Sequence, residues 1–270
     1  MPPSWTAFRS MTSSATSKLI QIHQIGSLRS RSVLINMTKL SRKCVPFTPF
    51  EMDLSKATIA IVSAAGVHQK DQEAFKIGGD LVGDFSYRVM GEEVESSNLL
   101  VTHYQYDHQD ADADINVVFP IDILRRLKAE GLIGGVALKH IGFMGSAMNL
   151  KAMYEQTALE IAEEINHGSG ADAVILTAGG PEICHRTIVA VQREIELRGI
   201  PTVLITVAPE VSTQMRPPRA LYPKGFKIGN SLGKPKMIGL QSKVLTDALN
   251  LLTQNTRPGL FVTIEYPEYC

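Results

Sequence analysis

The sequence predicts an α/β fold: a doubly wound, Rossmann-like and mainly parallel sheet with helices on both faces. Five short runs are mostly apolar, without regular polar alternation, and they alternate with longer segments that carry apolar residues at helical spacing. Strands that are apolar throughout are typical of parallel sheets buried on both faces. The segment from Asp172 to Val207 contains one complete strand–helix–strand unit of this kind, so a right-handed crossover is expected there.

The expected elements begin at residue 57. Strands are expected at 57–63, 99–102, 136–138, 172–177 and 202–207. Helices are expected at 120–130, 150–166, 183–198 and 243–252, and Gly131, Gly168 and Gly199 are placed to end the first three. The glycines of 142–145 predict a loop, and the stretches 217–220 and 229–235 predict a long irregular region after the fifth strand.

Composition narrows the class of protein. The chain has 270 residues, which suits one large domain or two small ones. Lys+Arg and Asp+Glu number 27 each, so the charge favours neither nucleic acid nor a membrane surface as a partner. No apolar run approaches the roughly 20 residues that span a bilayer. Three cysteines, Cys44, Cys184 and Cys270, lie too far apart in sequence to suggest a disulfide framework, which favours a reducing compartment.

Residues 1–50 differ from the rest of the chain. The first acidic residue is Glu51, whereas basic residues, serines and threonines are spread through this segment. The composition predicts a basic extension that is disordered or directs the protein to an organelle, and a translation start at Met37 is an alternative. The expected location is the mitochondrial matrix if the segment is a presequence and the cytoplasm otherwise. Residues 51–270 are expected to form a single α/β domain.

A cluster of histidines and carboxylates follows the second expected strand. It contains His103, Asp107, His108, Asp110, Asp112 and Asp114. In a doubly wound sheet, ligands bind beyond the carboxyl ends of the strands, so His103 and Asp107 are candidates for acid–base chemistry. A metal site formed by His103, Asp107 and His108 is a weaker alternative. The third interpretation is structural, because Asp and Asn also cap helices and bond loop amides.

A cysteine turn follows the fourth expected strand. Gly179 and Gly180 allow a tight turn, and Pro181 suits the first position of a helix. Cys184 would then lie in the first helical turn, where the helix dipole lowers the pKa of a thiol. His185 beside it is a candidate proton carrier. The alternative is that Cys184 is a small buried apolar residue.

Further residues at strand ends and in loops are candidates for binding a small substrate. Arg88 is suited to holding a carboxylate with two hydrogen bonds, and its alternative is a surface ion pair. The predicted substrate-binding residues are His68, Arg88, His108, Asp110, Gly179, Gly180, Arg219 and Asn230.

Taken together and in order, several segments resemble the selenoprotein-B-type subunits of glycine/sarcosine/betaine reductase and D-proline reductase. The segments are 66–68, 84–88, 102–120, 131–134, 143–145, 181–185, 218–220 and 230–235, and the 102–120 block is the most specific. The resemblance covers about Lys56 to Leu252. It implies a multi-subunit complex that cleaves C–N bonds of small amino acids reductively. It also implies a partner subunit with a pyruvoyl group that holds the amine, while a selenol or thiol of this subunit attacks carbon.

One departure from the family pattern bears on the chemistry. The family carries selenocysteine or cysteine immediately before the proline of the turn, whereas this chain has Gly180 before Pro181. Cys184 corresponds to the family's second cysteine, so the turn cannot form an internal disulfide. Three hypotheses follow: a reductase-like enzyme with Cys184 as its remaining nucleophile, a non-redox isomerase or lyase that uses His103, Asp107 and Cys184, or a non-catalytic binding subunit. No covalent cofactor is expected in this chain. An external thiol, a partner subunit or a second copy of the chain are the expected associates, with a small amino acid as ligand.

Overall fold

A computed structural model describes residues 44–77, 83–146, 150–254 and 257–269. These residues form an eight-stranded sheet. Seven of its strands lie in the order β10-β9-β8-β7-β1-β6-β3, and the eighth, β5, pairs with β1 beside β6. The strands of the sheet are β1 (Thr58–Ser63), β3 (Tyr87–Gly91), β5 (Gly135–Val136), β6 (Lys139–Phe143), β7 (Ala173–Thr177), β8 (Thr202–Ile205), β9 (Arg219–Lys224) and β10 (Leu260–Glu265). Two further strands, β2 (Val67–Gln69) and β4 (Leu99–Val101), form a small antiparallel sheet.

Along the chain, helices lie between many of the strands. The α-helices are α2 (Gln109–Ala113), α3 (Ile121–Ala129), α4 (Leu150–Ala152), α5 (Ala158–Gly168), α6 (Glu182–Glu196), α7 (Pro209–Met215) and α8 (Ile238–Asn250). A π-helical turn, η4 (Met153–Thr157), joins α4 to α5. Short 3-10 turns are η1 (Leu54–Lys56), η2 (Ser96–Asn98), η3 (Ile115–Val117) and η5 (Pro267–Tyr269).

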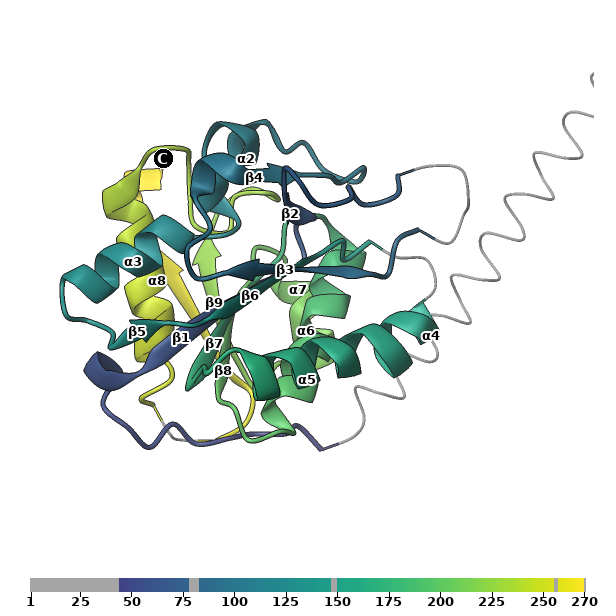
Figure 1. Ribbon diagram of the computed structural model, residues 1–270. Coiled ribbons are helices and arrows are strands. Elements are labelled where there is room, and N and C mark those ends of the chain that lie inside the picture. The colour runs from purple at the N-terminus through teal and green to yellow at the C-terminus, as the bar shows by residue number, and fades with distance from the viewer. Residues whose placement is uncertain (1–43, 78–82, 147–149, 255–256, 270) are drawn as a thin grey trace, which may run out of the picture. The chain divides into compact units, whose positions relative to one another are not determined.

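The sheet is parallel except at one edge, where β3 runs antiparallel to β6. Helices α3 and α8 cover one face and pack on each other, and α5 and α6 cover the other face (Figure 1). This arrangement confirms the predicted α/β fold with a mostly parallel sheet and helices on both faces. The connection from β1 leads to β6 on one side, whereas the following strands, from β7 on, lie on the other side. The order of the strands therefore reverses between β1 and β7, and such a point is where open α/β sheets bind ligands.

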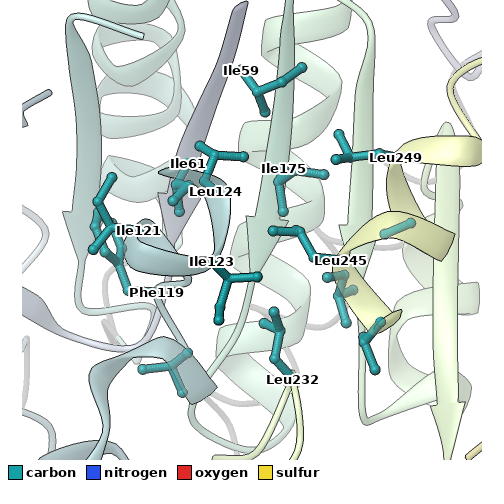
Figure 2. Packing of buried hydrophobic residues seen from close by; sticks show 14 of the residues in the cluster. Ile59, Ile61, Phe119, Ile121, Ile123, Leu124, Ile175, Leu232, Leu245 and Leu249 are labelled. Atoms are coloured by element: carbon teal, nitrogen blue, oxygen red, sulfur yellow. The ribbon is translucent and has the colours of Figure 1, made fainter. Parts of the chain in front are cut away.

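The core explains why the four central residues of β1, 59–62, are all apolar. Ile59 and Ile61 belong to the cluster that packs under α3 and α8, and the alternate residues Ala60 and Val62 are buried as well. Figure 2 shows Ile59, Ile61 and Ile175 of the strands gathered in one layer with side chains of the helices on that face. Burying an isoleucine side chain contributes about 1.5–3 kcal/mol to the stability of the fold. A strand of this composition is therefore stable only where other elements cover both of its faces.

Several elements differ from the sequence prediction. The run expected at 99–102 forms β4 in the small sheet, because it pairs with β2 instead of joining the main sheet. The strand expected at 136–138 is interrupted, and β6 extends into the predicted glycine loop as far as Phe143. The irregular region expected after residue 207 contains α7 and β9. Pro223 concealed β9 because proline is rare inside strands, but it lies beyond Leu221, the last residue that pairs with β8.

A buried ion pair closes the sheet at the amino end of β9. Arg219 Nη1 lies 2.8 Å from Glu196 Oε1, and neither side chain is exposed to solvent. The guanidinium stacks over the ring of Phe47 at 4.0 Å, and the hydroxyl of Thr48 donates to the Glu196 carbonyl at 2.8 Å. Residues 44–50 therefore pack within the same compact unit as the residues that follow them, and this unit begins at Cys44.

This placement corrects the prediction that Arg219 binds substrate. The residue starts a parallel strand, so it lies at the opposite edge of the sheet from the carboxyl ends that form ligand sites. Its charge is satisfied by Glu196 within the protein. The prediction of an organelle-targeting segment concerns residues of which 1–43 lie outside the described residues.

We expect Arg219→Met to destabilise the fold by about 3–5 kcal/mol, because it leaves the Glu196 carboxylate buried without its partner. Arg126→Met is the matched control, since it removes an arginine from an exposed ion pair with Glu130 and costs at most about 1 kcal/mol. Urea denaturation of the two variants measures both values. The double variant Glu196→Gln/Arg219→Met is expected to recover part of the loss, and equal destabilisation of Arg219→Met and Arg126→Met would contradict the assignment.

Candidate functional site

The carboxyl ends of β1 and β7 are tied together through one carbonyl group. The Ser63 hydroxyl donates to the Val118 carbonyl oxygen at 3.0 Å. The Thr177 hydroxyl bonds the same oxygen and lies 2.9 Å from Ser63 Oγ. All three groups are buried. These bonds fix the end of the 102–118 segment over the edge of the sheet where the strand order reverses.

His103 and Cys184 meet at this edge. His103 Nε2 lies 3.2 Å from Cys184 Sγ, and both residues are buried. The two residues come from loops that follow different strands, β4 and β7, as the sequence predicted. Cys184 lies in the first turn of α6, as predicted.

The hydrogen bonds fix the tautomer of His103. The backbone N–H of Gln105 donates to His103 Nδ1 at 3.1 Å, so Nδ1 is an acceptor without a proton. The proton of the neutral ring is then on Nε2, which donates to the Cys184 sulfur. In this arrangement His103 cannot accept the thiol proton through Nε2, but it can stabilise a thiolate by donating to it.

Burial dominates the ionisation of both groups. Desolvation raises the pKa of the Cys184 thiol to about 12, although backbone amides of the turn act in the opposite direction. Desolvation, followed by repulsion from His108, lowers the pKa of His103 to about 4. The expectation of a lowered thiol pKa at the start of α6 is therefore not met, because the loss of water around the sulfur outweighs the helix dipole.

Two tyrosines that the sequence analysis did not select enclose His103. The ring of Tyr104 stacks on the imidazole with centroids 5.9 Å apart, and the ring of Tyr106 meets it edge-on at 4.8 Å. The Tyr104 hydroxyl donates to the Ser146 carbonyl at 2.9 Å, and the Tyr106 hydroxyl donates to the Ala65 carbonyl at 3.0 Å. Both tyrosines follow His103 closely in the sequence, and this proximity was the available signal.

Gly179 and Gly180 make this packing possible. A Cβ atom on Gly180 would lie 2.5 Å from Cys184 Sγ and 2.8 Å from His103 Cε1. A Cβ on Gly179 would lie 2.6 Å from the Tyr106 hydroxyl. Both predicted residues therefore line the site, and the contact between His103 and Cys184 occupies the space that a side chain at position 180 would need.

Asp110 and Asn230 also meet at this edge. Asn230 Nδ2 donates to Asp110 Oδ2 at 2.7 Å, and the hydroxyl of the next residue, Ser231, donates to the Ala178 carbonyl at 2.8 Å. The loop after β9 is thereby joined to the 103–116 segment and to the turn after β7.

Asp107 and His108 take part in local bonds. Asp107 is exposed, and its carboxylate accepts the Gln109 N–H at 3.1 Å. His108 Nδ1 lies 2.8 Å from Asp112. The described residues contain no group of three or more histidine, cysteine, aspartate or glutamate side chains arranged to hold a metal ion, so the alternative through His103, Asp107 and His108 gains no support.

Three other candidates bond elsewhere. His185 Nδ1 lies 2.9 Å from the Thr206 hydroxyl, and burial lowers the pKa of this histidine to about 3. The His68 ring nitrogens bond the Gln69 carbonyl and the Thr102 hydroxyl, each at 2.8 Å. Arg88 Nε donates to the Glu73 carbonyl at 2.8 Å. His185 is thus adjacent to Cys184 in sequence, but its bonded nitrogen faces Thr206, which directly follows β8, and not the sulfur.

We predict that Gly180→Ala destabilises the protein by about 1–3 kcal/mol, because the added methyl group overpacks the contact between His103 and Cys184. Gly91→Ala is the control, since a Cβ there has no neighbour within 4 Å. Thermal denaturation compares the two variants. A Gly180→Ala protein as stable as Gly91→Ala would show that the close contact is absent in solution.

We predict that iodoacetamide modifies the exposed Cys44 before the buried Cys184 in the native protein at pH 8. The Cys184 thiol is shielded from the reagent, and its raised pKa leaves little thiolate at that pH. Mass spectrometry of tryptic peptides follows both residues over time, and unfolding in guanidinium chloride should make both reactive. Modification of native Cys184 as fast as that of Cys44 would contradict the buried site.

Comparison with known proteins supports the resemblance seen in the sequence. A sequence profile of the family described as glycine/sarcosine/betaine reductase selenoprotein B matches residues 33–179. The D-proline reductase subunit gamma of Acetoanaerobium sticklandii is 40% identical over 220 residues, which cover 82% of this chain and 88% of the relative. No solved structure matches the chain. Within the described residues, no helix is both long and apolar enough to cross a membrane.

Two further relatives are longer proteins. The glycine reductase complex component B subunit gamma of Carboxydothermus hydrogenoformans is 32% identical over 216 residues, which cover 77% of this chain and 48% of the relative. The betaine reductase complex component B subunit beta of Peptoclostridium acidaminophilum is 32% identical over 207 residues, which cover 74% of this chain and 46% of the relative. This chain therefore matches about half the length of these two proteins. None of the comparisons supports delivery to mitochondria. The match to the family profile and the extended identity to the D-proline reductase subunit show that the chain belongs to the glycine/sarcosine/betaine reductase selenoprotein B family.

Proposed function

We propose that this chain is a subunit of a reductase complex that cleaves a C–N bond of a small amino acid, with Cys184 as its nucleophile. The observation that carries the proposal is the hydrogen bond from His103 Nε2 to Cys184 Sγ at the point where the strand order reverses. The names of the relatives support the class of complex, because they are subunits of D-proline, glycine and betaine reductases. D-proline is the first substrate to test, since that relative is matched over most of its length.

The proposed reaction begins with attack of the Cys184 thiolate on the carbon that carries the nitrogen. The S–C bond forms, the C–N bond breaks, and the nitrogen leaves with the electron pair and takes a proton. An external thiolate then attacks the Cys184 sulfur, and the S–C electron pair passes to carbon, which takes a proton. A second external thiolate releases Cys184 from the mixed disulfide. Two thiols thus supply two electrons and leave as one disulfide.

In this proposal His103 holds no net charge and stabilises the attacking sulfur through its Nε2–H. Tyr104 and Tyr106 exclude water from the sulfur, which has no exposed surface. Because burial raises the pKa of Cys184 to about 12, reaction requires the 103–107 segment to move when a partner subunit presents the substrate. A partner-borne pyruvoyl group, which the family resemblance implies, would hold the substrate amine as a better leaving group.

A non-catalytic role in the complex is the second candidate. Its support is the complete burial of Cys184 together with Gly180 at the position where the family pattern has a selenol or thiol. The isomerase or lyase hypothesis has less support, because Asp107 is exposed and its carboxylate bonds the local Gln109 amide.

The test uses the complex isolated with its partner subunits from the cells that produce it. D-proline, glycine, sarcosine and betaine are each added with dithiothreitol, and reductive cleavage is measured from the reduced product and from disulfide formation. We expect Cys184→Ser to abolish turnover. We expect His103→Leu to lower kcat about 100-fold, because it removes a donor to the reacting sulfur, and His103→Gln to retain more activity because its amide can donate.

The same assay separates the two candidates. If Cys184→Ser turns over as fast as the unaltered complex while the complex stays assembled in gel filtration, the chain is a binding subunit. Deuterium exchange into the amino acid without any thiol, lost in His103→Leu, would instead favour proton-transfer chemistry.

A further inference from the structure

A cleft lies away from the contact between His103 and Cys184. Its volume is about 580 Å³, and it is lined by residues of the β4 region, α2, η3, α3 and the start of α8. Its lining includes neither His103 nor Cys184. Helix α2 connects the two places, because Asp110 bonds Asn230 whereas Ala111 and Asp112 line the cleft. Figure 1 shows α2 and β4 together at the end of α3.

Two ammonium groups in this cleft have no partner. Lys70 and Lys236 line it, and among the described residues neither side chain makes a hydrogen bond or an ion pair. Arg126 adds a third cation, although its Nε bonds Glu130 at 2.8 Å. The first turn of α8 contains no acidic residue, and its N-cap, Met237, supplies no side-chain acceptor. Three cationic side chains and the positive end of a helix dipole therefore adjoin the same cleft.

The acidic side chains of the cleft are held by donors within the protein. Asp114 accepts from the Lys236 N–H at 2.7 Å and from Gln241 Nε2 at 2.8 Å. Asp122 accepts from Asn116 Nδ2 at 3.0 Å, and Asp112 pairs with His108. These contacts engage the three carboxylates with groups other than the two lysine ammonium groups. Three acidic and three basic side chains line the cleft, so their formal charges sum to zero. Such a lining suits a ligand that carries one positive and one negative charge.

One buried acceptor in the wall of the cleft also lacks a donor. Gln241 Nε2 donates to Asp114 and to the Lys234 carbonyl, and these two acceptors fix the orientation of the amide. Gln241 Oε1 is then the unbonded atom, in a side chain with no exposed surface. A buried carbonyl oxygen without a donor is destabilising, and a ligand N–H group would remove this cost once the side chains that cover the oxygen move aside.

The apolar part of the lining completes the description of the ligand. It consists of Leu99, Leu100, Ala111, Ile115, Ile123 and Ile238. Leu100 and Ile238 are more than 40% exposed, at 43% and 47%. Apolar walls with a few placed polar groups are typical of sites for small molecules.

We infer that this cleft binds a free amino acid with an apolar side chain, as a site separate from Cys184. The ligand carboxylate lies against Lys70, Lys236 and the first turn of α8. Its ammonium group faces Gln241 Oε1 and the charge of Asp114, and its side chain packs on the leucines and isoleucines. This inference does not depend on the proposed reductase activity.

Lys236 offers a variant that removes the charge without straining the fold. Its φ is +62°, a value that glycine adopts more readily than a residue with a Cβ. Lys236→Gly therefore deletes the ammonium group while relieving the backbone, and it keeps the N–H that donates to Asp114. Lys70→Met removes the second ammonium group, and Lys128→Met on the exposed face of α3 is the charge-matched control outside the cleft.

Isothermal titration calorimetry on the full chain tests the site with L-leucine, D-leucine, L-proline and D-proline. We expect at least one of them to bind, and we expect its Kd to rise about tenfold in Lys236→Gly and in Lys70→Met, as for the loss of one charge-assisted hydrogen bond. The Kd should be unchanged in Lys128→Met and in Cys184→Ser. For a leucine that binds, 4-methylpentanoate and 3-methylbutylamine, which lack the amine and the carboxylate, should each bind more weakly.

Three results would overturn the inference. The first is that none of the four amino acids binds. The second is that binding is lost in Cys184→Ser and retained in Lys236→Gly, which would place the ligand at the other site. The third is that 4-methylpentanoate binds as tightly as leucine, which would show that Gln241 and the carboxylates do not recognise the ammonium group.

Discussion

The carbonyl oxygen of Val118 is the point on which the candidate site depends. Ser63 at the end of β1 and Thr177 at the end of β7 both bond it, so the ends of two adjacent strands and the returning chain share one acceptor. The segment between Gly66 and Val118 contributes the small sheet, β3 at the edge of the main sheet and α2, and then returns to this oxygen. His103 reaches Cys184 because both ends of that segment are fixed. Gly66 is needed at its start, since it has φ +78° and a Cβ there would lie 2.3 Å from the Thr102 carbonyl oxygen.

The sequence predicted those parts of the fold whose signal is local. In the unit from β7 through α6 to β8, both strands are mostly apolar and buried at every position, and Pro181 stands at the start of α6. This unit was placed correctly. Strands β9 and β10 were missed because β9 contains Pro223 and β10 is only partly buried. The role of Arg219 was not predictable from its own neighbourhood. Its partners, Glu196 and Phe47, are distant in sequence and are brought to it only by the tertiary fold.

The sequence predicted the residues of the candidate site better than it predicted their chemistry. His103, Cys184, Gly179 and Gly180 were selected from their positions after strand ends, and the structure brings them together. The ionisation of Cys184 follows from how much of the sulfur is buried, and that quantity depends on Tyr104, Tyr106 and the turn at Gly180 packing around it. His185 shows the converse: adjacency in sequence places neighbouring helical side chains on different sides, so its bonded nitrogen faces Thr206.

The direction of the hydrogen bonds at His103 has a consequence for how the sulfur is influenced. A backbone amide donates to one ring nitrogen and the other ring nitrogen donates to sulfur, so the imidazole conveys the polarity of a peptide group to Cys184 without a net charge of its own. Protonation of Nδ1 would break the first bond, and the His103 pKa of about 4 places that event well below neutral pH. The electrostatic influence of this histidine on the sulfur is therefore constant over the physiological range, which separates it from the histidines that act as pH sensors.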